Sequence, residues 1–416
     1  MNIAILHYSV APVVGGVEAV IQAHTRLLLG AGYHVTLIAG AGEKAALPEG
    51  ARFIHIPQMD SRHAEVLRIS QKLEAGEVPE NFQELSASLQ ASLEDALQDQ
   101  DVIIAHNLFT KHFNLPLTAA LVRLQEQEKL KRNIAWCHDL SWTSPHSRRS
   151  VHPGYPWELL RTYLEDSLYV TVSEHRRMEL AGLFNRPPSL IKVVYDGVDP
   201  ADLYSLSPEG LALVSQLGLL EADLVLLMAV RITQAKNFEL AWQVVAELKA
   251  RGIHLRLVVT GPPDPHDPGN MAYYQSLLDL RHKLGVEAEV RFVYESGPHA
   301  GSGYIIGSSL VNELFRVCDV LFMPSHREGF GMPILEAGLL GKPIFTTEIP
   351  AASEIGGRDL TCFRADDPPE VVAGMILDWT KSNPSQHLRQ RVRQQFTWQA
   401  IFNKDFLPLL TGGDPA

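Results

Sequence analysis

The sequence has little of what an extracellular, membrane-spanning or disulfide-built protein requires. Only three of its 416 residues are cysteine, and no two of them form a CxxC pair. This scarcity disfavours a disulfide framework and a thiolate zinc site. The longest apolar run, Leu224–Val230, is far shorter than the ~20 residues of a membrane helix. No basic segment precedes the first apolar run, as it would in a secretory leader. These absences predict a cytoplasmic protein.

Positive charge is also scarce. The chain carries 36 Lys and Arg against 48 Asp and Glu, a net charge of −12, whereas a general nucleic-acid binder needs a positive surface. The acidic excess is smaller in residues 1–195, where several arginines stand near one another in sequence: Arg148, Arg149, Arg161, Arg176 and Arg177. Solvated surface is the simpler interpretation, and contact with an acidic partner or a membrane surface stays open.

Two common motifs are missing. No two histidines stand four residues apart, so a helical HExxH metal site is absent, and no GxGxxG dinucleotide fingerprint occurs. We therefore predict no required metal and no cofactor, and a nicotinamide dehydrogenase is disfavoured.

Short apolar runs alternate with segments of helical periodicity along most of the chain. This alternation is typical of a parallel sheet covered by helices on both faces. The series occurs twice, which predicts an α/β protein of two tandem Rossmann-like, doubly wound domains facing across a cleft. Sheets of this kind bind ligands beyond the carboxyl ends of their strands. Two of them would hold two ligands, as a group-transfer enzyme requires.

The predicted boundaries follow from the two series. Residues 1–195 would form the N-terminal domain, and residues 196–390 the C-terminal domain. Residues 391–416 would contain an amphipathic helix that packs back on the first domain. The segment 261–310 is unusually rich in Pro, Gly and His, and we interpret it as a lid or an acceptor-binding element.

The stretch 320–347, VLFMPSHREGFGMPILEAGLLGKPIFTT, predicts a strand, a loop, a helix and a second strand. Pro333 suits the first turn of the helix, and the amides of Phe330, Gly331 and Met332 would lie at its positive end. Glu328 lies in the loop, and Glu336 is expected in the first helical turn. Two carboxylates near one helix start can accept bonds from sugar hydroxyls; helix-start acids without a ligand are the alternative.

The string SHREGFGMPILEAGLLGKPI, with Glu328 and Glu336 separated by seven residues, resembles the signature of family 4 glycosyltransferases (group 1) of the GT-B fold. The resemblance extends over most of the chain. It implies two Rossmann-like domains, of which the first is the acceptor domain and the second mainly binds the sugar-nucleotide donor, and transfer with retention. It further implies that Glu328 contacts the donor sugar, Glu336 the ribose hydroxyls, and the amides of Phe330 to Met332 the sugar and phosphates.

The segment AVRITQAKNFEL places Arg231 and Lys236 between a strand and a helix. Two cations there can stabilise the charge that develops on a departing diphosphate. A similar Arg-x4-Lys-Asn arrangement in the resembled family binds the diphosphate. A basic helix start is otherwise unfavourable against the helix dipole.

Three residues of the first half complete the predicted site. Gly15 and Gly16 form a tight loop before a helix, suited to phosphate. His138 follows a strand, where ligands of such sheets bind. In the resembled family the glycine loop packs near the donor phosphates and the acceptor. A similar histidine there lies near the donor sugar, so His138 is expected to bond the transferring sugar or to steer the acceptor.

These features predict a metal-independent, retaining glycosyltransferase that moves a hexose from a UDP- or GDP-sugar to a hydroxyl acceptor. Two alternatives remain at this point: a GT-B sugar-nucleotide epimerase, and a catalytically silent nucleotide- or glycan-binding protein. A GT-B phosphorylase would need a lysine-bound pyridoxal phosphate, to which nothing in the sequence points.

Overall fold

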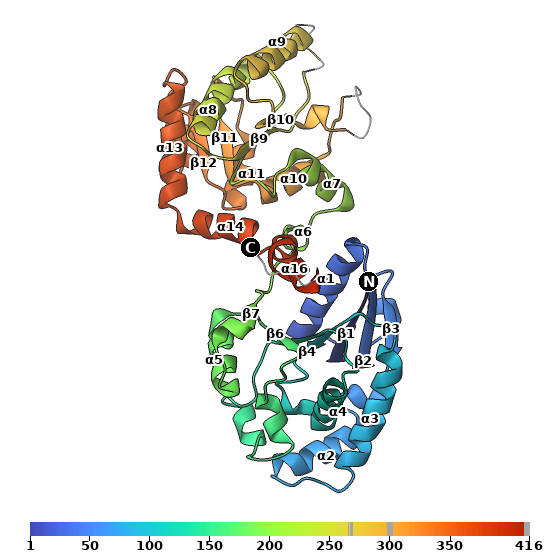
Figure 1. The fold of residues 1–416 in the computed structure, drawn as a ribbon. Helices are drawn as coiled ribbons and strands as arrows, with labels where there is room; N and C mark the ends of the chain where they lie inside the picture. Colours follow the sequence, from blue (N-terminus) through green and yellow to red (C-terminus); the bar gives the residue numbers. More distant parts are fainter. Residues whose placement is uncertain (265, 267–268, 298–302, 412–416) are drawn as a thin grey trace. The chain divides into compact units, whose positions relative to one another are not determined.

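The computed structural model describes residues 1–264, 266, 269–297 and 303–411. The chain divides into two compact units (Figure 1). Unit 1 consists of Met1–Gly197 together with the chain from Trp398 onward, and unit 2 of Val198–Thr397. Parts of the 261–310 segment that we interpreted as a lid or acceptor element lie outside the described residues.

Unit 1 contains a seven-stranded sheet in the order β3-β2-β1-β4-β5-β6-β7, and every pairing in it is parallel. Its strands are β1 (Asn2–Ser9), β2 (His34–Ala41), β3 (Arg52–His55), β4 (Val102–His106), β5 (Asn133–Cys137), β6 (Ser167–Thr171) and β7 (Ile191–Val193). The chain first winds outward from β1 to β3 and then returns to the other side of β1 with β4. The order therefore reverses between β1 and β4, which is where ligands bind in sheets of this type.

Both faces of this sheet are buried, which explains the unbroken apolar run of β1. Ile3 and Ile5 belong to one apolar cluster, and Ala4 and Leu6 to the other. Such two-sided burial is typical of parallel sheets. The long helices of the unit are α1 (Gly16–Gly30), α2 (Ala64–Glu74), α3 (Phe82–Leu97), α4 (Leu115–Glu126) and α5 (Glu174–Phe184). Helix α1 packs on the face of Ile3, and α2, α3 and α4 pack on the other face.

Unit 2 contains a six-stranded parallel sheet in the order β10-β9-β8-β11-β12-β13. Its strands are β8 (Leu224–Met228), β9 (Leu255–Val259), β10 (Val290–Phe292), β11 (Val320–Met323), β12 (Ile344–Thr347) and β13 (Thr361–Phe363). The order reverses between β8 and β11. Leu224 and Leu226 face one apolar cluster and Val225 and Leu227 the other, so this sheet is also covered on both faces.

The helices of unit 2 alternate with its strands. They are α6 (Pro200–Leu203), α7 (Pro208–Leu217), α8 (Phe238–Ala250), α9 (Asn270–Lys283), α10 (Ser308–Val317), α11 (Met332–Leu339), α12 (Pro350–Gly356), α13 (Pro369–Ser382) and α14 (Pro384–Gln395). Helices α8, α9 and α13 cover one face, and α7, α10, α11 and α12 cover the other. The prediction of two tandem doubly wound α/β domains is confirmed.

The C-terminal segment differs from the single helix expected over 391–410. Helix α14 ends in unit 2 at Gln395, and a new helical segment in unit 1 comprises α15 (Trp398–Ile401), a π-helical turn (Phe402–Phe406) and α16 (Leu407–Thr411). The break coincides with a bridge between Val198 and Thr397. The second segment buries apolar side chains against the β1 face that α1 also covers: Ile401, Phe402, Phe406, Leu409 and Leu410.

Two short edge strands, β3 and β13, were not predicted. Each pairs with a neighbour on one side only, and β3 has no fully buried residue. Their sequences therefore lack the apolar run that identifies the central strands. Within the described residues, no helix combines the length and apolar character that crossing a bilayer requires.

Candidate functional site

In unit 2, the predicted site residues gather where the strand order reverses. The segment after β8 carries Arg231 and Lys236, and the segment after the adjacent β11 carries Glu328. The two segments are bonded directly, because the His326 amide donates to the Ala235 carbonyl at 2.8 Å. The carboxyl edge of β8 and β11 therefore brings together residues that lie about 90 positions apart in sequence.

Lys236 and Glu328 form an ion pair at this edge. Lys236 Nζ donates to Glu328 Oε2 at 2.6 Å, and Ser325 Oγ donates to Glu328 Oε1 at 2.7 Å. The Glu328 side chain is 7% exposed and that of Lys236 17%. Ser325 is itself fixed, because its carbonyl accepts a bond from Thr347 Oγ1 at the end of β12. Both carboxylate oxygens are thus oriented, and a charge pair this shielded interacts more strongly than one in open solvent.

The turn between Lys236 and α8 depends on a residue with a left-handed backbone conformation. Asn237 has φ 51° and caps α8, its side-chain oxygen accepting the Leu240 amide at 3.4 Å. Asparagine tolerates this backbone conformation better than most residues. The adjacent residues Lys236 and Asn237 therefore combine a cation with the turn that positions it.

The glycine-rich loop after β11 opens α11 as predicted. Gly331 has φ 90° and occupies the N-cap, and Pro333 lies in the first turn. Phe330 and Met332 are about half exposed, at 54% and 55%. The first amides of a helix have no intrahelical acceptor, so this end presents N–H donors and a positive dipole beside the Lys236–Glu328 pair.

The expected position of Glu336 is wrong by one turn. Helix α11 begins at Met332, which makes Glu336 its fifth residue, and the first turn holds no acidic side chain. The alternative interpretation, an acid placed to favour the helix start, therefore does not explain Glu336. It is half-buried.

Arg231 is far more exposed than Lys236. Its side chain is 61% exposed, and Nη1 lies 4.0 Å from Asp264 Oδ1. Sequence analysis paired Arg231 and Lys236 as two cations for one anion. The structure gives each cation its own carboxylate partner. An incoming anion would therefore displace Asp264 from Arg231 and Glu328 from Lys236.

In unit 1, the glycine loop connects β1 to α1 at the corresponding reversal. Gly15 caps α1, and a Cβ there would lie 2.1 Å from Glu18 Oε2. Glu18 is in turn held by Ser9 Oγ, which donates to Oε1 at 2.6 Å. Gly16 has open space around its Cα. A side chain at Gly15 would therefore displace the Glu18 carboxylate, while Gly16 leaves room for a ligand to approach the backbone.

His138 lies at the same edge, in a group of buried histidines that sequence analysis did not find. His106 Nδ1 and His138 Nε2 are 2.9 Å apart and share a hydrogen bond. His7 Nδ1 donates to the His106 carbonyl at 2.9 Å. His24 stacks edge-on against Trp136, with ring centroids 4.6 Å apart. His7 lies near the end of β1, His106 ends β4 and His138 follows β5, so the group follows from the strand order.

Burial keeps these histidines neutral near pH 7. Desolvation lowers the pKa of His138 to about 3 and that of His24 to about 3. It also lowers the pKa of His106 well below its usual range, and that of His7 less strongly. A neutral imidazole offers one donor and one acceptor. The bond between His106 and His138 therefore fixes which nitrogen of His138 remains for a ligand.

Asn107 fixes the backbone of His138. It has φ 62°, and its Oδ1 accepts the amides of His138 at 2.8 Å and Asp139 at 3.1 Å. Asp139 also lies 3.4 Å from Arg176 Nη2 at the start of α5, where Ser173 caps the helix. An Asn directly after a strand was the available signal for this contact, but it becomes informative only when β4 and β5 are known to be neighbours.

Among the residues that the structure describes, no three His, Cys, Asp or Glu side chains are grouped as metal ligands. The arrangement instead provides an ion pair with helix amides in unit 2, and neutral imidazoles with a glycine loop in unit 1.

Comparisons with known proteins give both halves of the chain a match. A family model described as Glycosyltransferase Family 4 matches residues 14–202, and one described as Glycosyl transferases group 1 matches residues 213–395. The second match includes the Lys236–Glu328 pair and α11, and the first includes the glycine loop and His138.

Several curated relatives carry glycosyltransferase names. An uncharacterized glycosyltransferase of Methanocaldococcus jannaschii is 28% identical over 59% of this chain and 60% of its own length. A D-inositol 3-phosphate glycosyltransferase of Actinosynnema mirum is 33% identical over 54% of this chain and 49% of its own. A mannosylglucosylglycerate synthase of Petrotoga mobilis is 22% identical over 84% and 83%. The chain thus spans only about half the length of some of these relatives.

A crystal structure of Anabaena HepE in complex with UDP aligns with 99% of this chain and 100% of that chain. The sequence identity is 17% and the TM-score 0.37.

Proposed function

Because this chain belongs to the group 1 glycosyltransferases of family 4, we propose that it transfers a hexosyl group from a UDP- or GDP-sugar to a hydroxyl acceptor. The transfer retains the anomeric configuration and needs no metal. The observation that carries the proposal is the Lys236–Glu328 pair beside the exposed start of α11, at the strand reversal of unit 2.

The two side chains of this pair match two kinds of group in the donor. Lys236 matches its negative charge, and Glu328 matches its sugar hydroxyls. Lys236 and Arg231 stabilise the negative charge of the leaving diphosphate, and the amides of Phe330 to Met332 bind phosphate and sugar oxygens. Glu328, released from Lys236 by the phosphate, accepts bonds from the donor sugar hydroxyls. Glu336 accepts bonds from the ribose hydroxyls, as the family resemblance implies.

The neutral groups of unit 1 suit an uncharged nucleophile. His138 orients the transferring sugar or the acceptor hydroxyl through the nitrogen that His106 leaves available. The amides near Gly15 and Gly16 lie at the N-terminal, positive end of α1, where they can bind ligand oxygens. In the reaction the bond from the anomeric carbon to the diphosphate oxygen breaks, and a bond to the acceptor oxygen forms on the same face. The acceptor proton leaves with the diphosphate or to water.

The test is an acceptor-dependent transfer assay. The full chain is incubated with UDP- and GDP-hexoses and a panel of polyols and glycosides, with and without EDTA. The expected product is a glycoside of retained anomeric configuration, identified by NMR, and EDTA leaves its rate unchanged.

Other outcomes identify the alternatives. Conversion of the donor sugar into its epimer without a glycoside would indicate a sugar-nucleotide epimerase. Nucleotide binding with no turnover under any acceptor would indicate a silent binding protein. An inverted product, or loss of activity with EDTA, would contradict retention or metal independence.

A further inference from the structure

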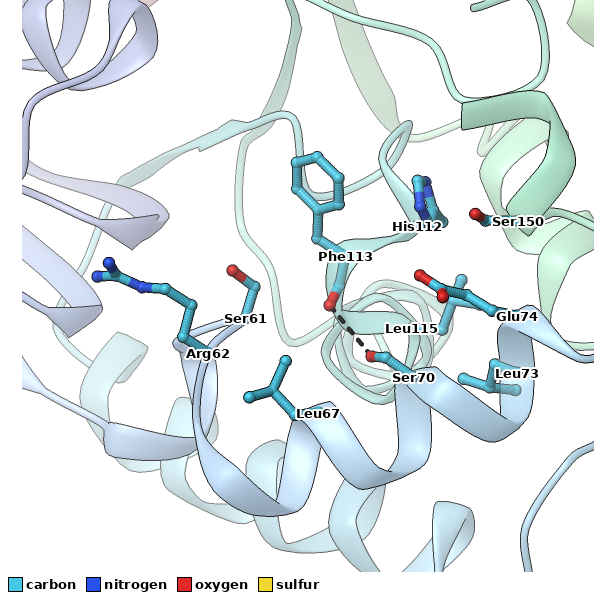
Figure 2. Close-up of a pocket in the computed structure, with 10 residues that line it drawn as sticks. All are labelled: Ser61, Arg62, Leu67, Ser70, Leu73, Glu74, His112, Phe113, Leu115 and Ser150. Carbon is cyan, nitrogen blue, oxygen red and sulfur yellow. Dashed lines mark hydrogen bonds between the residues drawn. The ribbon is translucent and has the colours of Figure 1, made fainter. Parts of the chain in front are cut away.

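Unit 1 contains a cavity that none of the residues discussed so far lines. Its volume is about 260 Å³. Figure 2 shows its lining residues, which come mainly from α2 and its preceding turn, the loop before α4 and Ser150. Pockets for drug-sized ligands begin at roughly 300 Å³, so this one suits a ligand of about one sugar ring. Its walls combine apolar and hydroxyl side chains: Leu67, Phe113, Ser61, Ser70 and Ser150.

Phe113 supplies a fixed, partly exposed aromatic face. The residue is 42% exposed, although the rings of Tyr8 and His112 lie close to its own, with centroids 5.9 and 5.1 Å away. The Lys111 ammonium lies 4.6 Å from the ring centroid. Ser70 Oγ donates to the Phe113 carbonyl at 3.4 Å, which ties the loop to α2 (Figure 2). The ring is thus held in place before any ligand arrives, and an apolar face of a sugar can stack on it.

The charges around the cavity balance. Arg62 lies 3.5 Å from Asp60 Oδ1, so its charge has a local partner. Glu74 offers a carboxylate on the cavity wall, next to Leu73 in Figure 2. His112 is neutral near pH 7, because burial and then the nearby Lys111 lower its pKa to about 4. A wall with no net excess of positive charge favours a neutral polyhydroxyl ligand over a phosphorylated one.

The cavity shares a loop with the candidate site. Residues 107–114 begin with Asn107, which accepts the His138 amide, and end with Phe113 and Asn114, which caps α4. The same loop is bonded to the segment after β5, because Ser141 Oγ lies 2.8 Å from His112 Nδ1. One loop therefore positions both the backbone of His138 and the aromatic face.

We propose that this cavity binds an uncharged sugar ring of the acceptor, stacked on Phe113 and bonded through its hydroxyls to the serines and to Glu74. The acceptor is then a glycoside or oligosaccharide without charge on that ring. The assignment to the acceptor rests on the proposed transferase function. The binding of a sugar ring in this cavity does not depend on that function.

The experiment measures binding to the full chain by saturation-transfer NMR and calorimetry. The probes are methyl glycosides of glucose, mannose and galactose, with glucose 6-phosphate as the charged counterpart and UDP and GDP in parallel samples. At least one methyl glycoside is expected to bind, with saturation strongest on the ring face that stacks. Glucose 6-phosphate binds more weakly than methyl glucoside.

Matched variants locate the binding. Phe113→Ala is expected to weaken glycoside binding about tenfold, the size of one aromatic contact, and Phe113→Leu keeps the apolar volume but also weakens it. Leu67→Ala weakens binding about threefold, since it removes part of the apolar wall. Leu190→Ala changes nothing; Leu190 has nearly the same exposure as Leu67, 44% against 43%, but lies outside the cavity.

Two results overturn the proposal: no methyl glycoside binds, or both Phe113 variants bind as the wild type does. Tighter binding of glucose 6-phosphate overturns the neutral-ligand assignment. Nucleotide binding without glycoside binding removes this inference and leaves the proposed function. Glycoside binding without any nucleotide or transfer removes the proposed function and leaves a sugar site.

Discussion

The two units share one architecture but carry different chemistry at their strand reversals. In unit 2, a lysine and a glutamate meet at 2.6 Å beside an exposed helix start. In unit 1, the equivalent position between β1 and β4 is lined by histidines that burial keeps neutral. The same sheet topology therefore places a lysine–glutamate pair at the reversal of unit 2, and neutral histidines beside Glu18 at the reversal of unit 1.

This difference suits the two unlike substrates of the proposed transfer. A diphosphate needs fixed cations and helix amides, because charge develops on it as the bond breaks. An acceptor hydroxyl needs oriented, neutral hydrogen-bonding groups and a surface on which a sugar can stack. The strand order supplies the location in both cases, and the loops supply the chemistry.

The largest expected effect concerns the charged edge. Lys236→Ala is expected to lower kcat/KM for transfer by about 100- to 1000-fold, since it removes a cation aimed at the leaving group. Steady-state kinetics with the preferred donor measures this. Lys249→Ala is the control, because Lys249 pairs with Glu289 at 3.0 Å elsewhere in unit 2. If both substitutions lowered kcat/KM equally, the Lys236–Glu328 pair would have no role beyond that of the Lys249–Glu289 ion pair.

Acid should affect the neutral edge through its histidines. The pKa of His24 falls from 6.5 to about 3 on folding, so the unfolded chain takes up the proton first. The stabilisation is present above pH 6.5 and is lost as the pH falls toward 3. For His24 the loss is about 1–2 kcal/mol at pH 5. Hydrogen exchange of the β4 amides, compared with those of β8, measures it.

His24→Phe tests the cause, because phenylalanine fills the aromatic contacts with Trp136 and Phe406 without titrating. Protection of β4 in this variant should fall less between pH 7 and pH 5. His282→Phe, at a side chain that is 85% exposed, serves as the control. The same pH slope in all three proteins would contradict the role of the buried imidazole.

A smaller effect compares two left-handed asparagines, one in each unit. Asn107 accepts two amides, at 2.8 and 3.1 Å, whereas Asn237 accepts one at 3.4 Å. Asn107→Gly should therefore cost about 1–3 kcal/mol of unfolding free energy, and Asn237→Gly a few tenths. Glycine keeps the left-handed backbone in both, so the difference isolates the hydrogen bonds. Urea unfolding gives both values, and a larger cost for Asn237→Gly would reverse the comparison.

Most of the fold was predictable, because the central strands are apolar on both faces and leave unbroken runs such as Leu224–Met228. The break between Gln395 and Trp398 was not, since the helical periodicity continues across it. The motif around Glu328 identified the family. Its partnership with Lys236 depends on β8 and β11 being neighbours, which local pattern does not reveal.

The histidine group shows the same limit more sharply. His7, His106 and His138 are spread over 130 residues, and each looks like an ordinary core histidine in its own segment. Only the order β1-β4-β5 brings them to one edge. Glu336 was misplaced for a local reason: the helix begins only after Gly331, whose positive φ sets the cap.

The central claim is that the charged edge of unit 2 binds a nucleoside diphosphate sugar. The most direct measurement is thermal stabilisation of the full chain by UDP, GDP, ADP and their hexose conjugates, combined with hydrogen exchange. One base should stabilise the protein by about 2.7 kcal/mol at 100 times its dissociation constant, with new protection at residues 231–237 and 325–339. Absence of any shift, with or without glycoside acceptors, or protection confined to unit 1, would contradict the claim.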